Sequence, residues 1–384
     1  MAGPVPAGGT ARLPYVGPVS TPDVPGPRIR WRRGVVTALG RSWRDSLELD
    51  VTVEGDGDLR ALAHPSVVGT PEVGDAVLLN TTAWAQRLGT GGYALVVAFP
   101  DRLPADPTGP GHLVKARYTG LQVTVQGVDE QETPHHRVIA DAEDVGGMPV
   151  VVADLHSALP AVLSGAHATD PALRVAYVMT DGGALPAAFS RTLDTLRDRL
   201  AGVVTVGQAF GGDLEAVTVH TGLLAARHVL HADVTVVAQG PGNLGTGTPW
   251  GFSGVAAGEA CNAVHVLGGR AVGALRISEA DPRPRHRGVS HHSLTAFGRV
   301  ALGGVTLVAP RGLSSELGTQ VGEDLAGQPE RNPVVWVPTE GLDAALAASP
   351  VRLSTMGRGL DAERAYFLAQ AAAGRYAADL AGPS

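Results

Sequence analysis

Short apolar runs at close spacing dominate the chain from residue 29 to residue 128. Turn sequences such as residues 54–57 (EGDG) and 89–92 (GTGG) separate these runs, and many of the runs are rich in β-branched residues. Such runs predict strands, because branched side chains pack well on a pleated surface and glycines permit tight turns. The predicted strands are residues 34–39, 47–53, 59–63, 75–80, 93–99 and 112–118, with 121–125 as an optional continuation. Short strands at this spacing favour a small β-barrel or sandwich.

The pattern changes after Gly147, where apolar strands alternate with helical periodicity. The predicted strands are residues 149–153, 174–179, 203–206, 234–238, 271–277 and 305–308, and the predicted helices are 185–200, 214–229, 254–267 and 361–380. Strand–helix alternation with continuously apolar strands is typical of a parallel sheet covered on both faces. The sequence therefore predicts an α/β fold, in which a C-terminal three-layer, parallel-sheet domain over residues 147–384 follows the small all-β domain.

Two further segments lack any periodic pattern. Residues 1–28 are rich in proline and glycine, which predicts a disordered tail. Residues 129–146 are polar and acidic, which is typical of a linker between the two predicted domains.

Composition narrows the function classes. The formal net charge of −7 weighs against a nucleic-acid binder, which usually carries a basic excess. Cys261 is the only cysteine, so a scaffold held by internal disulfides is excluded. No apolar run is long enough to span a bilayer, and the start of the chain lacks a signal-peptide pattern. We therefore expect a cytoplasmic protein without a membrane partner, and homo-oligomer formation stays open.

Residues 233–259 join a predicted strand to a predicted helix through a glycine-dense loop, with Ser253 as the expected helix cap. Glycines let a ligand approach the backbone closely, and free N–H groups at a helix start attract anions. The spacing matches neither an ordinary NAD site nor a Walker loop. The loop predicts a phosphate or carboxylate site. Its candidate ligand-binding residues are Gly240, Gly242, Asn243, Gly245, Thr246, Gly247 and Thr248.

Polar residues also follow other predicted strands, and the carboxyl ends of parallel strands meet at one edge, where ligands bind. His156 and Ser157 follow the first strand of the predicted sheet, Asp181 the second and Asp213 the third. His156, Asp181 and Asp213 are therefore candidate catalytic residues, and Ser157 is a candidate ligand-binding residue. The need for Asp and Ser in turns is the alternative explanation.

The segment after the fifth predicted strand, residues 281–293 (DPRPRHRGVSHHS), is rich in arginine and histidine. Its two prolines predict an extended path that places Arg283, Arg285 and Arg287 on one side. Guanidinium groups bind phosphate and carboxylate through paired hydrogen bonds. These three arginines are therefore further candidate ligand-binding residues.

The histidines of the same segment are candidate catalytic residues. Ser290 is the expected cap of the next helix, which places His291 and His292 in its first turn. Adjacent helical residues point in different directions, so we do not expect both imidazoles to bind one metal. One of them, together with His286 or His156, could act as a general acid or base. A divalent metal is a further hypothesis, with cofactor identity unknown and Asp154, His156 and His291 as candidate ligands.

Lys115 is the only lysine among 30 basic residues. A genome biased toward arginine codons explains most of this skew. A lysine that survives such a bias suggests a position that needs a compact, titratable ammonium. Lys115 is therefore a further candidate ligand-binding residue.

Several of these segments resemble those of a known family. The chain is similar, in its combined motifs, to the uncharacterised bacterial domain-of-unknown-function family 3866, and KARYTGLQ around Lys115 is similar as well. The resemblance implies a bacterial protein of this length, and it supplies no established activity and no catalytic residue. The segments that carry it are residues 153–162, 177–190, 207–217, 239–254 and 281–298.

The sequence thus predicts an enzyme, a hydrolase or a transferase, that acts on a small anionic substrate at the C-terminal edge of the sheet. The substrate would be phosphorylated or nucleotide-like. The alternative is a non-catalytic ligand sensor or assembly module that uses the same cleft and needs no acid/base pair. A third hypothesis is metal-dependent hydrolysis.

Overall fold

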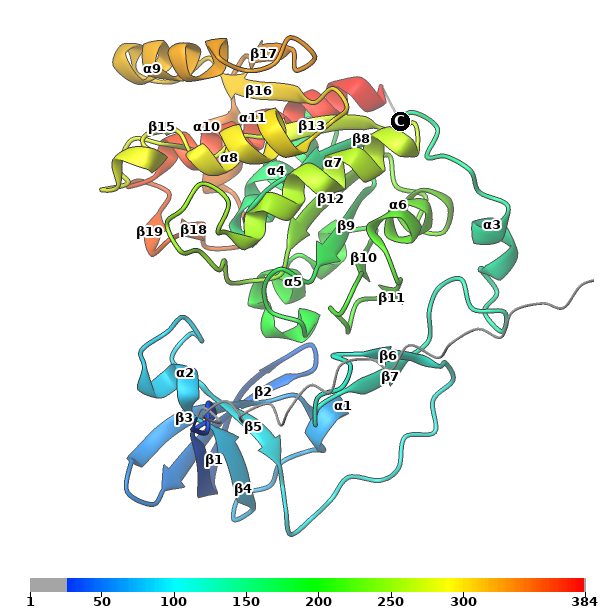
Figure 1. The fold of residues 1–384 in the computed structure, drawn as a ribbon, viewed down its shortest axis with the longest axis vertical. Coiled ribbons are helices and arrows are strands. Elements are labelled where there is room, and N and C mark those ends of the chain that lie inside the picture. Colours follow the sequence, from blue (N-terminus) through cyan, green and yellow to red (C-terminus); the bar gives the residue numbers. More distant parts are fainter. Residues whose placement is uncertain (1–25, 383–384) are drawn as a thin grey trace, which may run out of the picture.

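The computed structural model describes residues 26–382. The predicted disordered tail, residues 1–28, lies almost entirely outside the described residues. Figure 1 shows a small β-barrel at one end of the molecule and a larger unit of sheet and helices at the other. The predicted α/β fold, preceded by a barrel-like unit, is confirmed.

The N-terminal unit is a closed barrel with the strand order β1-β2-β3-β5-β4. Of the two predicted folds, barrel and sandwich, the structure has the barrel. Two short helices connect its strands, and β6 and β7 form a separate antiparallel hairpin rather than barrel strands. The elements are β1 (Trp31–Trp43), β2 (Ser46–Val53), β3 (Gly57–Ala63), α1 (Pro65–Val68), β4 (Ala76–Asn80), α2 (Thr82–Ala85), β5 (Ala94–Ala98), β6 (Leu113–Lys115) and β7 (Val123–Val125).

The larger unit is built on an eight-stranded parallel sheet with the order β11-β10-β9-β12-β8-β13-β16-β17. Six of these strands match the predicted ones, and the two edge strands, β11 and β17, are additional. The strands are β8 (Pro149–Val152), β9 (Val175–Thr180), β10 (Gly202–Thr205), β11 (Leu214–Glu215), β12 (Val234–Gln239), β13 (Arg270–Ala274), β16 (Thr306–Pro310) and β17 (Val334–Val337). Short pairs β14 (Ile277–Ser278) with β15 (Gly288–Val289), and β18 (Ser354–Thr355) with β19 (Arg358–Gly359), lie outside it.

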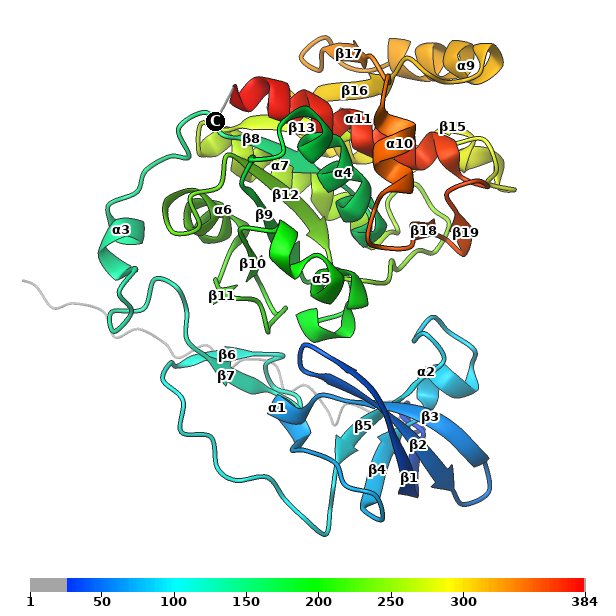
Figure 2. The same ribbon diagram turned by 180° about the vertical axis from the view of Figure 1, so that it is seen from behind.

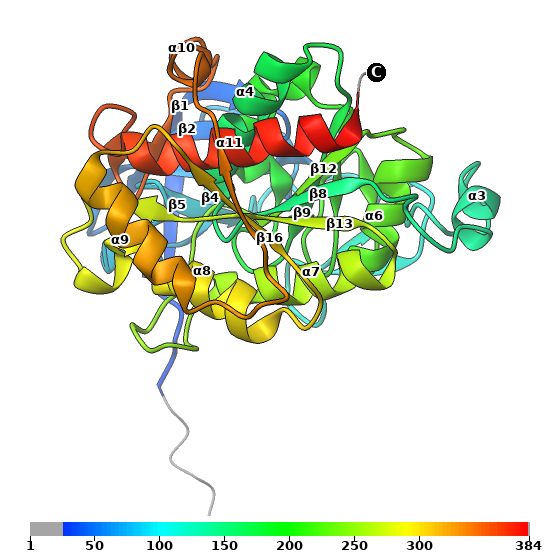
Figure 3. The same ribbon diagram turned by 90° about the horizontal axis from the view of Figure 1, so that it is seen from above.

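Helices cover both faces of this sheet, as the view along it in Figure 3 shows. One face carries α4 (Leu159–Thr169), α10 (Leu342–Ala347) and α11 (Arg364–Ala381), which face the viewer in Figure 2. The other carries α6 (Val219–His228), α7 (Ala256–Val266), α8 (His291–Thr295) and α9 (Ser315–Ala326). The remaining helices are α3 (His136–Ala140), within the predicted linker, and α5 (Arg191–Thr195).

Two predicted helices have different bounds in the structure. The predicted helix 185–200 is instead a series of short turns around α5, because the Ser190 hydroxyl accepts the Leu193 N–H and starts a new helix there. The predicted helix 214–229 begins only at Val219. Its first residues pair with β10 as an edge strand, and the Thr218 side chain caps the shortened helix.

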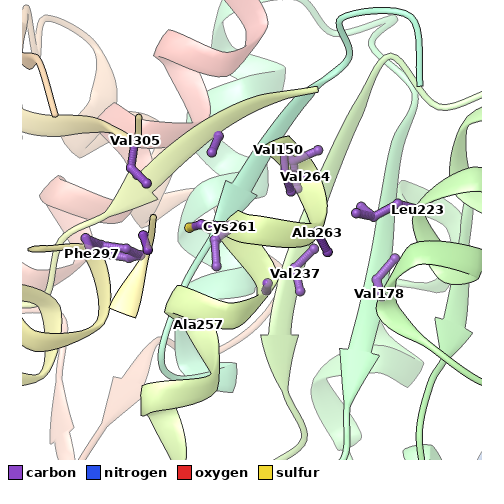
Figure 4. Packing of buried hydrophobic residues seen from close by; sticks show 14 of the residues in the cluster. Val150, Val178, Leu223, Val237, Ala257, Cys261, Ala263, Val264, Phe297 and Val305 are labelled. Atoms are coloured by element: carbon purple, nitrogen blue, oxygen red, sulfur yellow. The ribbon is translucent and has the colours of Figure 1, made fainter. Parts of the chain in front are cut away.

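Along each central strand, successive buried side chains pack on opposite faces of the sheet. Val236 packs with the α4 and α11 side of the sheet, whereas its neighbour Val237 packs with the α6 and α7 side. Figure 4 shows Val237 beside Ala263 of α7, and Val264 of the same helix beside Val150 of β8. Successive strand residues point to opposite faces, and each buried apolar side chain contributes roughly 1.5–3 kcal/mol. This double-sided burial explains why the central strands are apolar throughout.

Helices α4 and α11 approach each other closely through two glycines. A Cβ added to Gly165 would lie 1.9 Å from the Ala371 carbonyl oxygen, and one added to Gly374 would lie 1.9 Å from that of Val162. Only glycine fits at such backbone contacts. The long alanine-rich helix therefore lies directly against α4.

The barrel is fixed to the segment that follows β9. The indole Nε1 of Trp43 and the hydroxyl of Ser46 both donate to the Ala188 carbonyl oxygen, each at 2.8 Å. The Arg191 guanidinium lies over the Trp43 ring, 4.4 Å from its centroid, and pairs with Glu48 of the barrel. These contacts attach the barrel near the carboxyl end of the sheet.

Candidate metal centre

Three neighbouring strands of the sheet supply the residues of the candidate site. In the order β12-β8-β13, the glycine-rich loop follows β12, Asp154 follows β8, and the histidine-rich segment follows β13. The helix after β8 lies on one face of the sheet, whereas the helices after β12 and β13 lie on the other. Such a switch opens a crevice at the carboxyl edge of a parallel sheet.

Three imidazoles converge in this crevice. One ring nitrogen from each of His286, His291 and His292 lies within 4.8 Å of the other two, and this is the group of possible metal ligands found among residues 26–382. Zinc binds nitrogen at about 2.1 Å in a tetrahedral arrangement, which requires nitrogen separations of roughly 3.4 Å. A modest closing of the three rings would therefore complete a metal site.

The two adjacent histidines lie close together, although neighbouring helical positions point in different directions. Ser290 caps α8 as predicted, accepting from the His292 N–H at 3.2 Å. The rings of His291 and His292 nevertheless lie 4.5 Å apart between centroids. Both pack on Phe252: His292 stacks on it at 3.8 Å, and His291 meets its edge at 5.8 Å. A shared aromatic contact outside the helix thus overrides the divergence of neighbouring helical positions.

Hydrogen bonds orient two of the imidazoles. His292 Nδ1 lies 3.3 Å from an Asp154 carboxylate oxygen, and His286 Nδ1 lies 2.7 Å from the Ser290 hydroxyl. A carboxylate only accepts hydrogen bonds, whereas Arg276 Nη1, which only donates, lies 3.5 Å from the same Nδ1. On the shorter contact, to Asp154, we assign the proton of His292 to Nδ1, which leaves Nε2 with its lone pair. Pairing a histidine with a carboxylate in this way is common behind metal ligands, and it holds the ring in place.

Two of the three histidines are neutral at physiological pH. Burial, together with the nearby cations Arg276 and Arg283, lowers the pKa of His286 to about 3. Burial likewise lowers the pKa of His291 to about 4, with added repulsion from His292. Nε2 of His291 is buried and has no hydrogen-bond partner among the described residues. Metal ligation requires neutral imidazole, and His286 and His291 meet this requirement.

Cations surround the cluster. Arg283 binds Asp281 through two hydrogen bonds, of 2.9 and 2.8 Å, and Arg358 and Arg276 approach the same carboxylate at 3.2 and 3.5 Å. The hydrogen bonds from Arg283 lower the pKa of Asp281 well below its usual range, although burial opposes the shift. Nη2 of Arg276 is buried without a hydrogen-bond partner within residues 26–382. Glu363, which also pairs with Arg358, and Asp281 offset the charge of these arginines.

A hollow of about 510 Å³ opens beside His291. Its lining includes Gly247 of the glycine-rich loop together with Arg285 and Arg299. The Arg299 guanidinium lies over the Trp250 ring, 4.3 Å from its centroid. Arg285 has no hydrogen-bond or ion-pair partner in the described part of the chain, so its guanidinium remains available to a ligand.

The three arginines do not form the expected row. Residues Pro284–His286 form a short 3₁₀ turn, which interrupts the predicted extended path. Arg283 is held by Asp281 on the protein side, and Arg287 is exposed and does not line the hollow. Arg285 is the member of the row that reaches this site.

The glycine-rich loop closes on itself. Within it, the Thr246 N–H donates to the Gly251 carbonyl at 2.7 Å, and the Thr246 and Thr248 hydroxyls lie 3.2 Å apart. Ser253 is not the expected helix cap, because its hydroxyl donates to Asn243 and the cap position of α7 carries no side-chain bond. Gly245 pairs with Phe252 across this closed loop. Several polar groups of the loop therefore bond within the loop, and anion binding by its remaining backbone N–H groups stays a prediction.

The start of the loop has a packing role. A Cβ on Gly240 would lie 2.4 Å from the Ala184 carbonyl oxygen, so glycine is required there by a neighbouring segment. Gly242 and Asn243 line a second hollow of about 250 Å³, together with His156 and Ser157. The predicted single cleft is thus divided between two hollows that the loop borders.

His156 does not join the histidine cluster. Its Nε2 lies 2.7 Å from the Ser190 hydroxyl, and its Nδ1 lies 2.9 Å from the Tyr177 hydroxyl. Burial lowers its pKa to about 4. Both ring nitrogens have protein partners, so the structure gives no support to His156 as a metal ligand.

The two other predicted aspartates hold backbone in place. Asp181 accepts from the Gln208 N–H at 2.9 Å. Asp213 accepts from the Val203 N–H at 2.8 Å and pairs with Arg44 of the barrel at 3.1 Å. These are the turn and anchoring roles that the alternative explanation assigned to such residues.

Lys115 is a buried structural residue rather than an available cation. Its ammonium donates to the carbonyl oxygens of Thr205 and Ala209, at 2.9 and 2.8 Å, and to a Glu215 carboxylate oxygen at 2.8 Å. Burial lowers the pKa of Lys115 despite this pairing. All three ammonium hydrogens have protein acceptors, so none remains for a ligand.

Comparison with known proteins identifies the family. Residues 60–374 match the family described as Protein of unknown function (DUF3866), and this stretch contains all three clustered histidines. The chain belongs to this family. No curated protein and no solved structure matches this family member. Among its described residues, none of the helices has the length and apolar character needed to cross a membrane.

Proposed function

We propose that the protein is a metal-dependent hydrolase of small anionic substrates, with zinc held by His286, His291 and His292. The convergence of three imidazoles at one point of the sheet edge, one of them with an unpartnered buried nitrogen, carries this proposal. Three nitrogen ligands leave one position of a tetrahedral zinc ion for water, whose pKa the metal lowers to near 7.

The other residues of the site have distinct roles in this proposal. Asp154 holds the ring of His292 and directs Nε2 toward the metal. Arg285, at the hollow beside His291, binds the anionic group of the substrate. Arg276 and Arg283 also lie nearby, but both pair with Asp281, so Arg285 is the cation that remains for the anionic substrate. We place this reaction in the cytoplasm.

Chromogenic esters test the activity. Zinc-loaded protein is assayed with 4-nitrophenyl phosphate, 4-nitrophenyl hemisuccinate and the neutral 4-nitrophenyl acetate. We expect at least one anionic ester to exceed the neutral ester by about 10-fold or more in kcat/KM, since a charge-assisted contact contributes roughly 1.5–3 kcal/mol. His292→Ala should abolish the turnover.

Two arginine variants form a matched pair. Arg285→Ala should raise KM for the anionic ester by about 10-fold while the Tm stays nearly unchanged, because Arg285 is exposed and binds no protein group. Arg287→Ala, an exposed arginine outside the lining, should leave the kinetics unchanged. Stoichiometric zinc without turnover of any ester would instead favour the sensor hypothesis, and turnover that survives His292→Ala would contradict the proposal.

A further inference from the structure

A second, chemically different hollow lies between the barrel and the sheet unit. It measures about 440 Å³, and all three neighbouring parts of the chain contribute to its lining. Leu62 and Leu95 come from the barrel, Leu121 from the β6–β7 hairpin, and Phe189 and Phe210 from the sheet unit. It therefore differs from the metal centre in both place and character.

The size and lining of this hollow suit a small molecule. Sites for small molecules are typically 300–1,000 Å³ in volume, mainly apolar, and frequent at the interface between two domains. The hollow has each of these properties.

The lining sets the charge of the occupant. No aspartate, glutamate, lysine or arginine is among the lining residues. A charged ligand would lose its hydration here without gaining a countercharge, which is strongly unfavourable. His64 is the one histidine in the lining, and burial lowers its pKa, so it is neutral as well. A neutral, largely apolar molecule fits this environment.

His64 also specifies one polar group of the occupant. Its Nδ1 lies 3.1 Å from the Asp45 carbonyl oxygen, which only accepts hydrogen bonds, so Nδ1 carries the proton. The Nε2 lone pair has no partner among residues 26–382. We propose that this hollow binds a neutral, mainly hydrocarbon small molecule whose single hydroxyl or N–H group donates to His64 Nε2.

Three probes of one shape test the proposal by fluorescence titration of the full chain: 4-phenylphenol, biphenyl and biphenyl-4-carboxylate. We expect 4-phenylphenol to bind one site per chain. Biphenyl should bind about 10-fold more weakly because it lacks the donor, and the carboxylate about 100-fold more weakly because it is charged. Failure of all three to bind, or equal binding of the carboxylate and the phenol, would overturn the proposal.

Variants locate the binding site. His64→Phe should give the phenol and biphenyl equal affinities, and Leu121→Trp should fill the hollow and abolish binding of both. Leu103→Trp, at a 75% exposed position outside the lining, is the matched control and should bind as the wild type does. Unchanged phenol affinity in both His64→Phe and Leu121→Trp, with normal folding by circular dichroism, would contradict the assignment. None of these outcomes depends on zinc.

Discussion

Two buried polar clusters of this protein differ in how completely their groups are satisfied. Around Lys115, the ammonium has three acceptors, and the Glu215 carboxylate also accepts from the Thr205 hydroxyl and the Gly211 N–H, each at 2.6 Å. Around the three histidines, by contrast, His291 Nε2 is buried without a hydrogen-bond partner within residues 26–382, and Arg276 Nη2 has only an ion-pair contact with Asp281, at 3.5 Å.

The difference indicates which cluster serves folding and which serves a ligand. Folding satisfies nearly all buried polar groups, so a closed network needs no explanation beyond stability. Converging side chains with unpartnered nitrogens do need one, because each such group costs about 1–3 kcal/mol when left unsatisfied. The contrast supports a structural role for the Lys115 cluster and agrees with the metal-binding role that we propose for the histidines.

The largest expected effect is a loss of stability when the hydrogen-bond network around Lys115 is disrupted. Lys115→Met leaves the Glu215 carboxylate buried without its cation, so we expect the free energy of unfolding to fall by about 3–5 kcal/mol. Urea denaturation measures this loss. Adding Glu215→Gln removes the uncompensated charge and should restore at least half of the lost stability. A loss below about 1 kcal/mol in the single variant would show that the cluster is not structural.

A smaller expected effect is a loss of zinc affinity when Asp154, the carboxylate beside His292, is changed. Asp154→Asn weakens the support of His292, so we expect zinc affinity to fall by about 10–100-fold while folding is retained. Competition with a chromogenic chelator gives the affinity. Asp213→Asn, which alters an aspartate bound to backbone and Arg44, is the control and should bind zinc normally. Equal affinities in the two variants would contradict a role for Asp154.

The smallest expected effect is a change in the free energy of unfolding when the histidine cluster is altered. His291→Leu removes an unsatisfied buried nitrogen, so the metal-free protein should keep its free energy of unfolding or gain up to about 1 kcal/mol. Thermal and urea unfolding in chelator would show this. A loss of more than about 2 kcal/mol would place His291 with the structural group instead.

Much of the fold could be predicted from local pattern. Short strands with glycine turns predicted the barrel, and strand–helix alternation predicted the parallel sheet. The pattern failed where tertiary contacts decide local structure. Leu214 and Glu215 fit a helical periodicity, yet they pair with β10 as an edge strand. Apolar spacing over residues 185–200 could not show that Ser190 would start a new helix.

The candidate site was only partly predictable. The sequence identified the histidine-rich segment and the Ser290 cap, but it could not show that Phe252, from a separate loop, brings two adjacent histidines together. The rarity of lysine wrongly suggested an available cation at Lys115, because composition carries no information on its partners. The pairing of Asp281 with Arg358, 77 residues away, has no local signal.

Zinc stoichiometry tests the central claim most directly. Protein purified without chelators is analysed for metal content, and the metal-free form is then titrated with zinc against a chromogenic competitor, alongside His286→Ala, His291→Ala and His292→Ala. We predict one zinc ion per wild-type chain and at least about 100-fold weaker binding in each variant, since each loses one of three ligands. A wild type that binds zinc no better than these variants would contradict the assignment of a metal centre.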